Sequence, residues 1–246
     1  MFKNITQTAL LFVILTTNSI AQTSKTHLPF SRAGKAAFAY FEEIQAPNFD
    51  GYLKAIRWDR VSSELKARII AILPKQDIVS PSAEGRAKLA AVEPILMYHD
   101  LGSVIDLKVI RMGQAVVLFL AGAAVLISEE ALDLLTAKEL QAIIAHELGH
   151  GYFWNEWQQA RLNKQYDKMQ EIELRCDGMA VITMSHLGLD PSSFISAINK
   201  LTRSHKGNLI NADFYPSLEE RIRFIREMIE IVKGNGRMPG PVAASN

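Results

Sequence analysis

The feature that most constrains this chain is a pair of histidines four residues apart, His146 and His150, with Glu147 directly after the first. Upstream, Thr136 and Glu139 have the spacing of a capping box, which predicts that the pair lies inside an α-helix. Residues i and i+4 lie on one helical face, so both imidazoles can reach a single ion. Glu147 would point beside that ion, where it can take a proton from a bound water. The alternative is a surface helix with two solvated histidines.

A pair of acidic residues further along the chain supplies the next candidate. Catalytic zinc has three protein ligands and an open fourth position. Glu173 and Asp177 are spaced i and i+4 on a helix predicted over residues 165–187. We expect Glu173 to bind the metal and Asp177 to accept the second N–H of a ligand histidine, while Glu171 faces elsewhere. The longer motif with a third histidine at position 156 is excluded, because Glu156 stands there. The other histidines are alternative ligands: His27, His99, His186 and His205.

The first 21 residues have the pattern of a secretory signal peptide. Lys3 gives a positive start, residues 9–15 form a short apolar run, and Ser19 and Ala21 fit a cleavage site. The apolar run is shorter than the roughly 20 residues that span a membrane. We therefore expect export to the periplasm or the extracellular space, with a mature chain that begins at Gln22. An uncleaved amphipathic anchor is the alternative.

Composition excludes several classes of protein. The formal net charge of +1 provides no basic surface, so no nucleic-acid partner is expected. The apolar fraction of 48% and the charged fraction of 22% are typical of a globular chain, and 246 residues favour one domain. Cys176 is the only cysteine, so no intrachain disulfide can form. We expect Cys176 to be a buried structural thiol.

The part of the chain before residue 100 reads as helical. Residues 22–34 are polar and are predicted to be a flexible lead-in. Apolar periodicity predicts helices over 35–45, 61–73 and 83–98. Pro94 should kink or break the third of these helices.

Three short strands are then predicted, over residues 104–111, 116–120 and 124–127. Gly122 between the last two favours a hairpin or a bend. The combined apolar stretch of residues 115–127 is too short for a membrane span, so no span is expected in the mature chain.

Helices fill the rest of the chain. Ser128 should start a short one, residues 192–204 form another, and Ser217 and Glu220 form a second capping box before the last. Residues 234–246 are rich in Gly and Pro and are predicted to be disordered. The fold class is therefore α+β: mainly helical, with a small sheet beside the motif helix.

Two motifs resemble a known family. The segment from Leu134 to His150 is similar to the active-site helix of metallopeptidase family forty-eight, a gluzincin group that includes the CAAX prenyl protease and HtpX-type proteases. The family's Glu-x-x-Ala-Asp motif has its counterpart in residues 173–177, with Cys176 in place of Ala. The resemblance covers roughly residues 105–230 and implies a zincin-type metallopeptidase domain, which we place at residues 35–233.

A third element is similar but altered. The family has a His-Pro pair with an Arg five residues after the Pro, and this chain has Tyr215, Pro216 and Arg221. The family histidine is thought to approach the metal or the reaction oxyanion. The resemblance therefore implies that Tyr215 donates a hydrogen bond in its place. The alternative is that Tyr215 only packs beside Pro216 at the start of the last helix. Arg221 is expected either to pair with Asp177 or to be an ordinary charge on the helix surface.

These patterns together predict an exported zinc endopeptidase that acts on proteins or peptides. One Zn²⁺ would be held by His146, His150 and Glu173, with Glu147 as general base. A strand within 115–128 would pair with extended substrate, as the resemblance implies. A zinc-stabilised scaffold or chaperone-like module without turnover is the alternative, and a zinc hydrolase acting on another bond is a smaller one.

Overall fold

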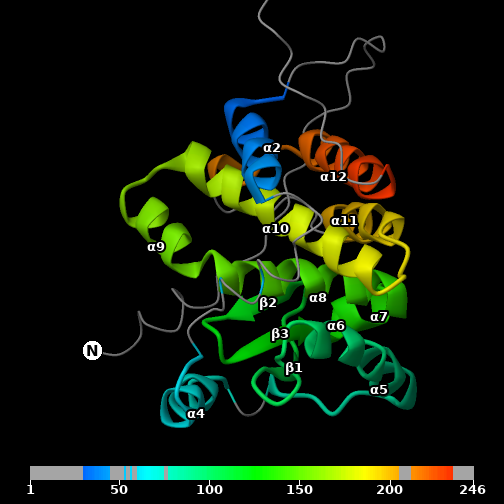
Figure 1. Ribbon diagram of the computed structural model, residues 1–246. Helices are drawn as coiled ribbons and strands as arrows, with labels where there is room; N and C mark the ends of the chain where they lie inside the picture. Colours follow the sequence, from blue (N-terminus) through cyan, green and yellow to red (C-terminus); the bar gives the residue numbers. More distant parts are fainter. Residues whose placement is uncertain are drawn as a thin grey trace, which may run out of the picture.

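The computed structural model is α+β, as predicted, with many helices around one small sheet (Figure 1). It describes residues 30–44, 53, 56, 60–74, 77–204 and 212–234. The predicted signal peptide and residues 235–246 of the predicted tail lie outside the described residues. Among the helices that are described, none has the length and apolar character needed to cross a bilayer.

The helices before the sheet are α2 (Arg32–Ile44), α4 (Ser63–Ala71), α5 (Ala83–Ala90) and α6 (Glu93–Tyr98). The predicted break between the last two is confirmed, because Pro94 occupies the first turn of α6, where its missing N–H disrupts no helical bond. The first helix begins earlier than predicted, inside the expected lead-in. The hydroxyl of Ser31 accepts a bond from the Gly34 N–H at 3.1 Å, which satisfies a donor at the start of α2.

The sheet consists of β1 (Asp106–Ile110), β2 (Val117–Leu120) and β3 (Ala124–Ser128) in the order β1-β3-β2. β3 is central, parallel to β1 and antiparallel to β2. The hairpin predicted around Gly122 is confirmed, and Gly122 has a φ of 73° that suits a residue without Cβ. This order leaves β2 at one edge of the sheet.

Both faces of β2 and β3 are buried, which explains their continuous apolar sequences. One face joins the main core, and the other forms a small second cluster with Leu73 and Ile69 of the α4 region. Leu65, Ile69 and Ile72 fall on one face of this region, and that face is only partly buried. Leu65 is 46% exposed and Ile72 52% exposed, because the outer face of the sheet engages α4 mainly through Ile69.

The C-terminal half contains α7 (Glu129–Leu134), α8 (Ala137–Tyr152), α9 (Trp154–Leu162), α10 (Tyr166–His186), α11 (Ser192–Ser204), the short 3-10 helix η3 (Ala212–Phe214) and α12 (Leu218–Lys233). α10 is the central helix, packed against α8 on one side and against α2 and α12 on the other (Figure 1). Gly178 permits this packing, since a Cβ there would lie 2.3 Å from the ring of Phe41 on α2.

Two local features differ from the prediction. α9 was not predicted, because Phe153 both ends α8 and begins α9, and the turn between them contains neither Gly nor Pro. At the second capping box, the Ser217 hydroxyl accepts from the Glu220 N–H as expected. The Glu220 carboxylate accepts from the backbone N–H of Ser31 at 3.0 Å, so it ties α12 to the start of α2.

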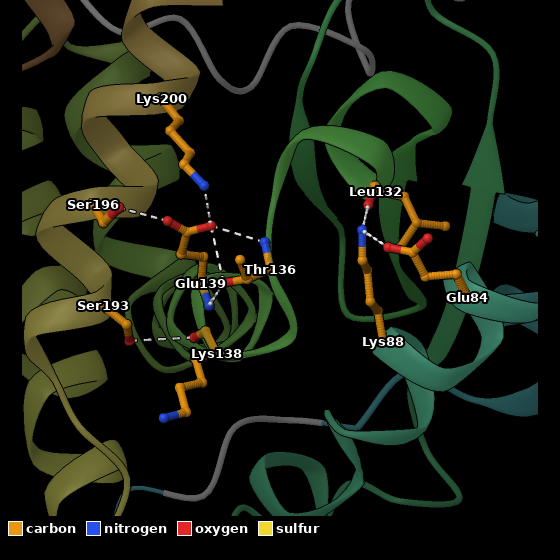
Figure 2. A network of polar contacts seen from close by, with 9 residues as sticks. All are labelled: Glu84, Lys88, Leu132, Thr136, Lys138, Glu139, Ser193, Ser196 and Lys200. Carbon is orange, nitrogen blue, oxygen red and sulfur yellow. Dashed lines mark hydrogen bonds and ion pairs between the residues drawn. The ribbon is translucent and has the colours of Figure 1, made fainter.

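The capping box at the start of α8 is complete and extends into a contact between helices. Glu139 accepts from the backbone N–H of Thr136 at 2.8 Å and from its hydroxyl at 3.0 Å. The same carboxylate accepts from Ser196 at 2.5 Å and from the Lys200 ammonium at 2.7 Å, both on α11 (Figure 2). Burial by itself would raise the pKa of Glu139, but Lys200 and the hydroxyls outweigh it and lower the pKa to about 2. This network fixes where α8 begins relative to α11.

We expect Glu139→Gln to lower the unfolding free energy by about 2 kcal/mol at pH 7, since several charge-assisted hydrogen bonds are lost. Because the pKa of Glu139 is depressed in the folded state, its contribution is complete above about pH 4.5. It is lost as the pH falls through about 2. Urea unfolding of both proteins between pH 7 and pH 2 measures the difference, which should shrink as the pH falls.

The matched control is Glu84→Gln on α5. Glu84 forms an i,i+4 ion pair with Lys88 at 3.0 Å, but its side chain is 78% exposed (Figure 2). Exposed pairs of this kind contribute about 0.3–0.5 kcal/mol. Equal losses for the two substitutions would contradict a special role for Glu139.

Candidate metal centre

Helix α8 places three candidate residues together, as predicted. His146, Glu147 and His150 each offer a ligand atom, and these atoms lie within 4.8 Å of one another. All three side chains are buried. Two solvated histidines on a surface helix are therefore excluded. This buried group can hold a metal ion.

Glu173 on α10 faces the same point from the opposite helix. One of its carboxylate oxygens lies 3.6 Å from His146 Nε2, and the other lies 3.7 Å from His150 Nε2. Atoms about 2.0–2.1 Å from a tetrahedral ion are separated by roughly 3.3–3.4 Å from one another. The observed distances are close to that spacing. Both Glu147 and Glu173 are thus near enough to approach an ion between the two imidazoles.

Asp177 lies one turn further along α10 and contacts the other nitrogen of His146. The Nδ1 of His146 is 2.8 Å from Asp177 Oδ1, although the ring N–H meets that oxygen obliquely. Arg221 on α12 donates to both oxygens of Asp177, from Nε at 2.9 Å and from Nη2 at 2.6 Å. Of the two roles considered for Arg221, the structure has the pairing with Asp177. This series of contacts, from His146 through Asp177 to Arg221, therefore joins α8, α10 and α12.

The second histidine has a different neighbour. The Sγ of Cys176 lies 3.6 Å from the Nδ1 of His150. Cys176 is fully buried, as predicted for a structural thiol, and burial raises the pKa of that thiol well above its usual value. Gly149 is in tight contact with it, since a Cβ at position 149 would lie 3.0 Å from Cys176 Cα. A thiol thus occupies, beside His150, the place that a carboxylate occupies beside His146.

The edge of the sheet reaches Glu147. The backbone N–H of Phe119 on β2 donates to Glu147 Oε2 at 2.8 Å. The Ser128 N–H donates to the Val116 carbonyl at 2.9 Å, and the Val116 N–H donates to the Ser128 hydroxyl at 2.9 Å, so Val116 is turned toward β3. Alternation along β2 then turns the backbone groups of Val117 and Phe119 toward the outer edge. The ring of Phe119 packs edge-on against Trp154 of α9, with centroids 6.0 Å apart. The outer edge of the sheet therefore borders the candidate metal centre.

The two histidines have opposite pKa shifts. Burial by itself would lower the pKa of His146, but the carboxylates of Asp177 and Glu173 outweigh it and raise the pKa to about 9. At His150 burial prevails and lowers the pKa to about 4. Without a metal, His146 therefore holds a proton at neutral pH that a metal ion would displace.

The pKa values of the three acids are also shifted in different directions. Burial raises the pKa of Glu147 to about 8, and Glu173 adds to the rise. Burial would also raise the pKa of Glu173 and Asp177, but His150 and Arg221, respectively, outweigh it and lower them. A nearby divalent cation favours the ionised form of a carboxyl, so it would oppose the rise at Glu147.

The charges of the donor set fit a divalent cation. The centre contains three buried carboxylates, those of Glu147, Glu173 and Asp177, and Asp177 pairs with the buried guanidinium of Arg221. When all four groups are ionised and the imidazoles are neutral, their formal charges leave an excess of two negative charges. Buried charges are costly unless they are paired or coordinate a metal. Two imidazoles and a carboxylate are also one of the ligand sets of catalytic zinc.

Tyr215 lies near this group, after η3. Its side chain is half-buried. Burial by itself would lower the pKa of the Arg221 guanidinium, but Asp177 raises it above its usual value, and Glu173 and Tyr215 add to the rise. Tyr215 is therefore within electrostatic reach of Arg221.

Two further acids lie away from the centre. Glu171 contacts Lys168 at 3.0 Å and also pairs with Arg175, which confirms that it faces elsewhere. Glu156, at the position where the longer motif has histidine, pairs with Lys168 and Arg175 at 3.0 and 3.2 Å. These contacts account for both acids without a metal.

The other histidines are engaged elsewhere or lie outside the described residues. His99 contacts the Tyr152 hydroxyl at 2.8 Å and the Thr183 hydroxyl at 3.0 Å. His186 contacts the Tyr98 hydroxyl at 2.8 Å. His27 and His205 lie outside the described residues. The described histidines that face Glu173 are His146 and His150.

Sequence reasoning missed two contacts of the centre, those of Phe119 with Glu147 and of Cys176 with His150. The first involves a backbone N–H, which carries no residue signature. For the second a signal existed, since Cys176 lies three residues after Glu173 and therefore on the same face of the helix. No family model matches this chain, and no curated protein matches it.

The buried pair of Asp177 and Arg221 generates a stability prediction. In metal-free protein, Asp177→Asn or Arg221→Met alone should lower the unfolding free energy by about 3–5 kcal/mol, because each leaves the partner charge buried and uncompensated. The double variant should lose clearly less than the sum of the two, as interacting residues do. Urea unfolding in the presence of a chelator measures all four proteins. Additive losses would contradict the pairing.

Proposed function

We propose that this chain is a zinc-dependent endopeptidase with a zincin-type domain. The observation that carries the proposal is the convergence of both Nε2 atoms on the Glu173 carboxylate, at 3.6 and 3.7 Å, in a buried site. Glu147 lies beside this point and next to the outer edge of the sheet. The resemblance of the motif helix and of residues 173–177 to metallopeptidase family forty-eight supports the same function.

The proposed ligands are His146, His150 and Glu173. When bound, one zinc ion per chain would supply Lewis acidity at the substrate carbonyl and would lower the pKa of water toward about 7. Asp177 holds the ring of His146 through Nδ1, which leaves Nε2 free for the metal. Arg221 in turn fixes Asp177 through two contacts.

Glu147 is the proposed general base and then the general acid. Its carboxylate takes a proton from the water whose oxygen attacks the peptide carbonyl carbon. As the C–N bond breaks, Glu147 delivers that proton to the departing amine nitrogen. The second proton of the water leaves with the new carboxyl product. Glu147 must be ionised to accept this proton. Burial raises the pKa of Glu147, and a cation bound nearby would favour its carboxylate form.

The edge strand β2 is the proposed binding surface for substrate. An extended peptide can add to a sheet edge through backbone hydrogen bonds, and Val117 presents its backbone groups on that edge, two residues before the Phe119 N–H that donates to Glu147. The substrate class is therefore protein or peptide.

We further propose that Tyr215 donates a hydrogen bond to the developing oxyanion, in the place of the family histidine.

We also propose export of the chain to the periplasm or the extracellular space, on the pattern of residues 1–21.

A second candidate function, a zinc-stabilised scaffold without turnover, rests on Tyr215 standing where the family has histidine. Glu147 favours the enzyme, because a structural zinc site does not need an acid that binds no metal. The two candidates differ in turnover, and the effect of Glu147 on turnover separates them.

The ligand role of Glu173 is tested by metal content. Purified wild type should hold about one zinc per chain, and Glu173→Ala should lose most of it, because a third ligand is removed. Glu171→Ala is the matched control, a nearby acid on the same helix whose partners are Lys168 and Arg175. Mass spectrometry of zinc per folded chain measures both. Equal zinc content in the two variants would remove Glu173 from the ligand set.

The catalytic role of Glu147 is tested by Glu147→Gln. The amide keeps the size of the side chain but cannot take the proton, so proteolysis of an unfolded protein should fall at least about 100-fold. Zinc content and folding should be retained, since Glu147 is not a proposed ligand.

Two results would contradict the enzyme. One is activity of Glu147→Gln equal to that of wild type. The other is a zinc-loaded wild type that cleaves no member of a broad peptide library, which would favour the scaffold.

A further inference from the structure

We propose that Cys176 is the positioning residue of His150. Its sulfur accepts the Nδ1–H of the imidazole and so holds Nε2 toward the metal. This inference rests on the proposed zinc site and assigns a role to the residue by which this chain departs from the family motif. The observation behind it is the 3.6 Å contact between Cys176 Sγ and His150 Nδ1 inside the core. A thiol can accept or donate a weak hydrogen bond.

The ring nitrogen that the sulfur contacts distinguishes a positioning role from a ligand role. His150 Nε2 faces Glu173 at 3.7 Å, whereas Nδ1 faces Cys176. The sulfur therefore contacts the nitrogen that is not turned toward the proposed metal position. A residue on that side fixes the tautomer and the orientation of a ligand histidine.

The crossing of α8 and α10 holds the thiol in this place. Gly149 precedes His150 on α8 and lies against Cys176, so that an added Cβ would be 3.2 Å from Sγ. The sulfur is fully buried and cannot turn into solvent. The two helices are thus in tight contact beside the place where the thiol meets the ring.

The two ligand histidines are consequently held with unequal strength. His146 contacts a carboxylate that is itself bound by Arg221. His150 contacts a neutral thiol, which is a weaker acceptor than a carboxylate. The His150 side is therefore expected to be the weaker half of the zinc site. Loss of the sulfur should loosen His150 without unfolding the chain.

The experiment compares zinc affinity and metal-free stability in Cys176→Ala, Cys176→Ser and Val181→Ala. Cys176→Ala removes the acceptor and leaves a small residue, as in the family motif. Cys176→Ser restores an acceptor. Val181→Ala is the matched control, because Val181 is fully buried on the same helix, eight residues after Glu173. Affinity is measured by competition with a chromophoric chelator, and stability by urea unfolding in excess chelator.

We expect Cys176→Ala to weaken zinc binding about tenfold, near the lower end of the 10–100-fold effect of residues that orient metal ligands. Cys176→Ser should recover much of the loss. Val181→Ala should lower metal-free stability but change zinc affinity less than about twofold. In Co²⁺-loaded protein, the ligand-field absorption should change in Cys176→Ala and not in Val181→Ala.

Three results would overturn this assignment. If Cys176→Ala keeps the zinc affinity and Co²⁺ spectrum of wild type, the thiol only fills space. If its loss of affinity is matched by Val181→Ala, the effect is one of packing. If wild type itself binds no zinc, the proposed function fails and the role of Cys176 fails with it.

Discussion

The close packing of α10 against α8 is the constraint on which the rest of the structure depends. α8 supplies His146, Glu147 and His150, but these residues alone surround a metal position on one side only. α10 supplies Glu173 opposite them and Asp177 and Cys176 behind the two imidazoles. The absence of a side chain at Gly149 permits this approach. α2 and α12 cover the other side of α10, and the Asp177–Arg221 pair links α12 to the centre.

The buried charges explain why such a core would contain a metal. The carboxylates of Glu147, Glu173 and Asp177 are buried at the candidate centre, and of these Asp177 pairs with the guanidinium of Arg221. Such an arrangement costs free energy unless a cation compensates it. In metal-free protein, the raised pKa of His146 and the raised pKa of Glu147 provide partial compensation by protons. A divalent ion would replace those protons, so metal affinity should depend on pH and couple to folding.

The sequence predicted those features whose causes lie within a few neighbouring residues. The start of α8 at Thr136 and the turn of the hairpin at Gly122 are of this kind. The i,i+4 spacing also placed His146 and His150 on one face. The prediction was weaker where tertiary packing decides. The exposed side of α4 depends on how much of the sheet it covers, and the contact of Glu220 with Ser31 joins residues 189 positions apart. The contact of Phe119 with Glu147 uses a backbone group that the sequence does not mark.

The central claim is that two imidazoles and one carboxylate meet at a single zinc ion. X-ray absorption spectroscopy of the zinc-loaded chain tests this most directly, because zinc–sulfur bonds are about 2.3 Å long and zinc–nitrogen or zinc–oxygen bonds about 2.0–2.2 Å. The account predicts a first shell of nitrogen and oxygen only, with the scattering pattern of two imidazoles, although Cys176 lies 3.6 Å from His150 Nδ1. A sulfur atom in the first shell, or fewer than two imidazoles, would contradict it.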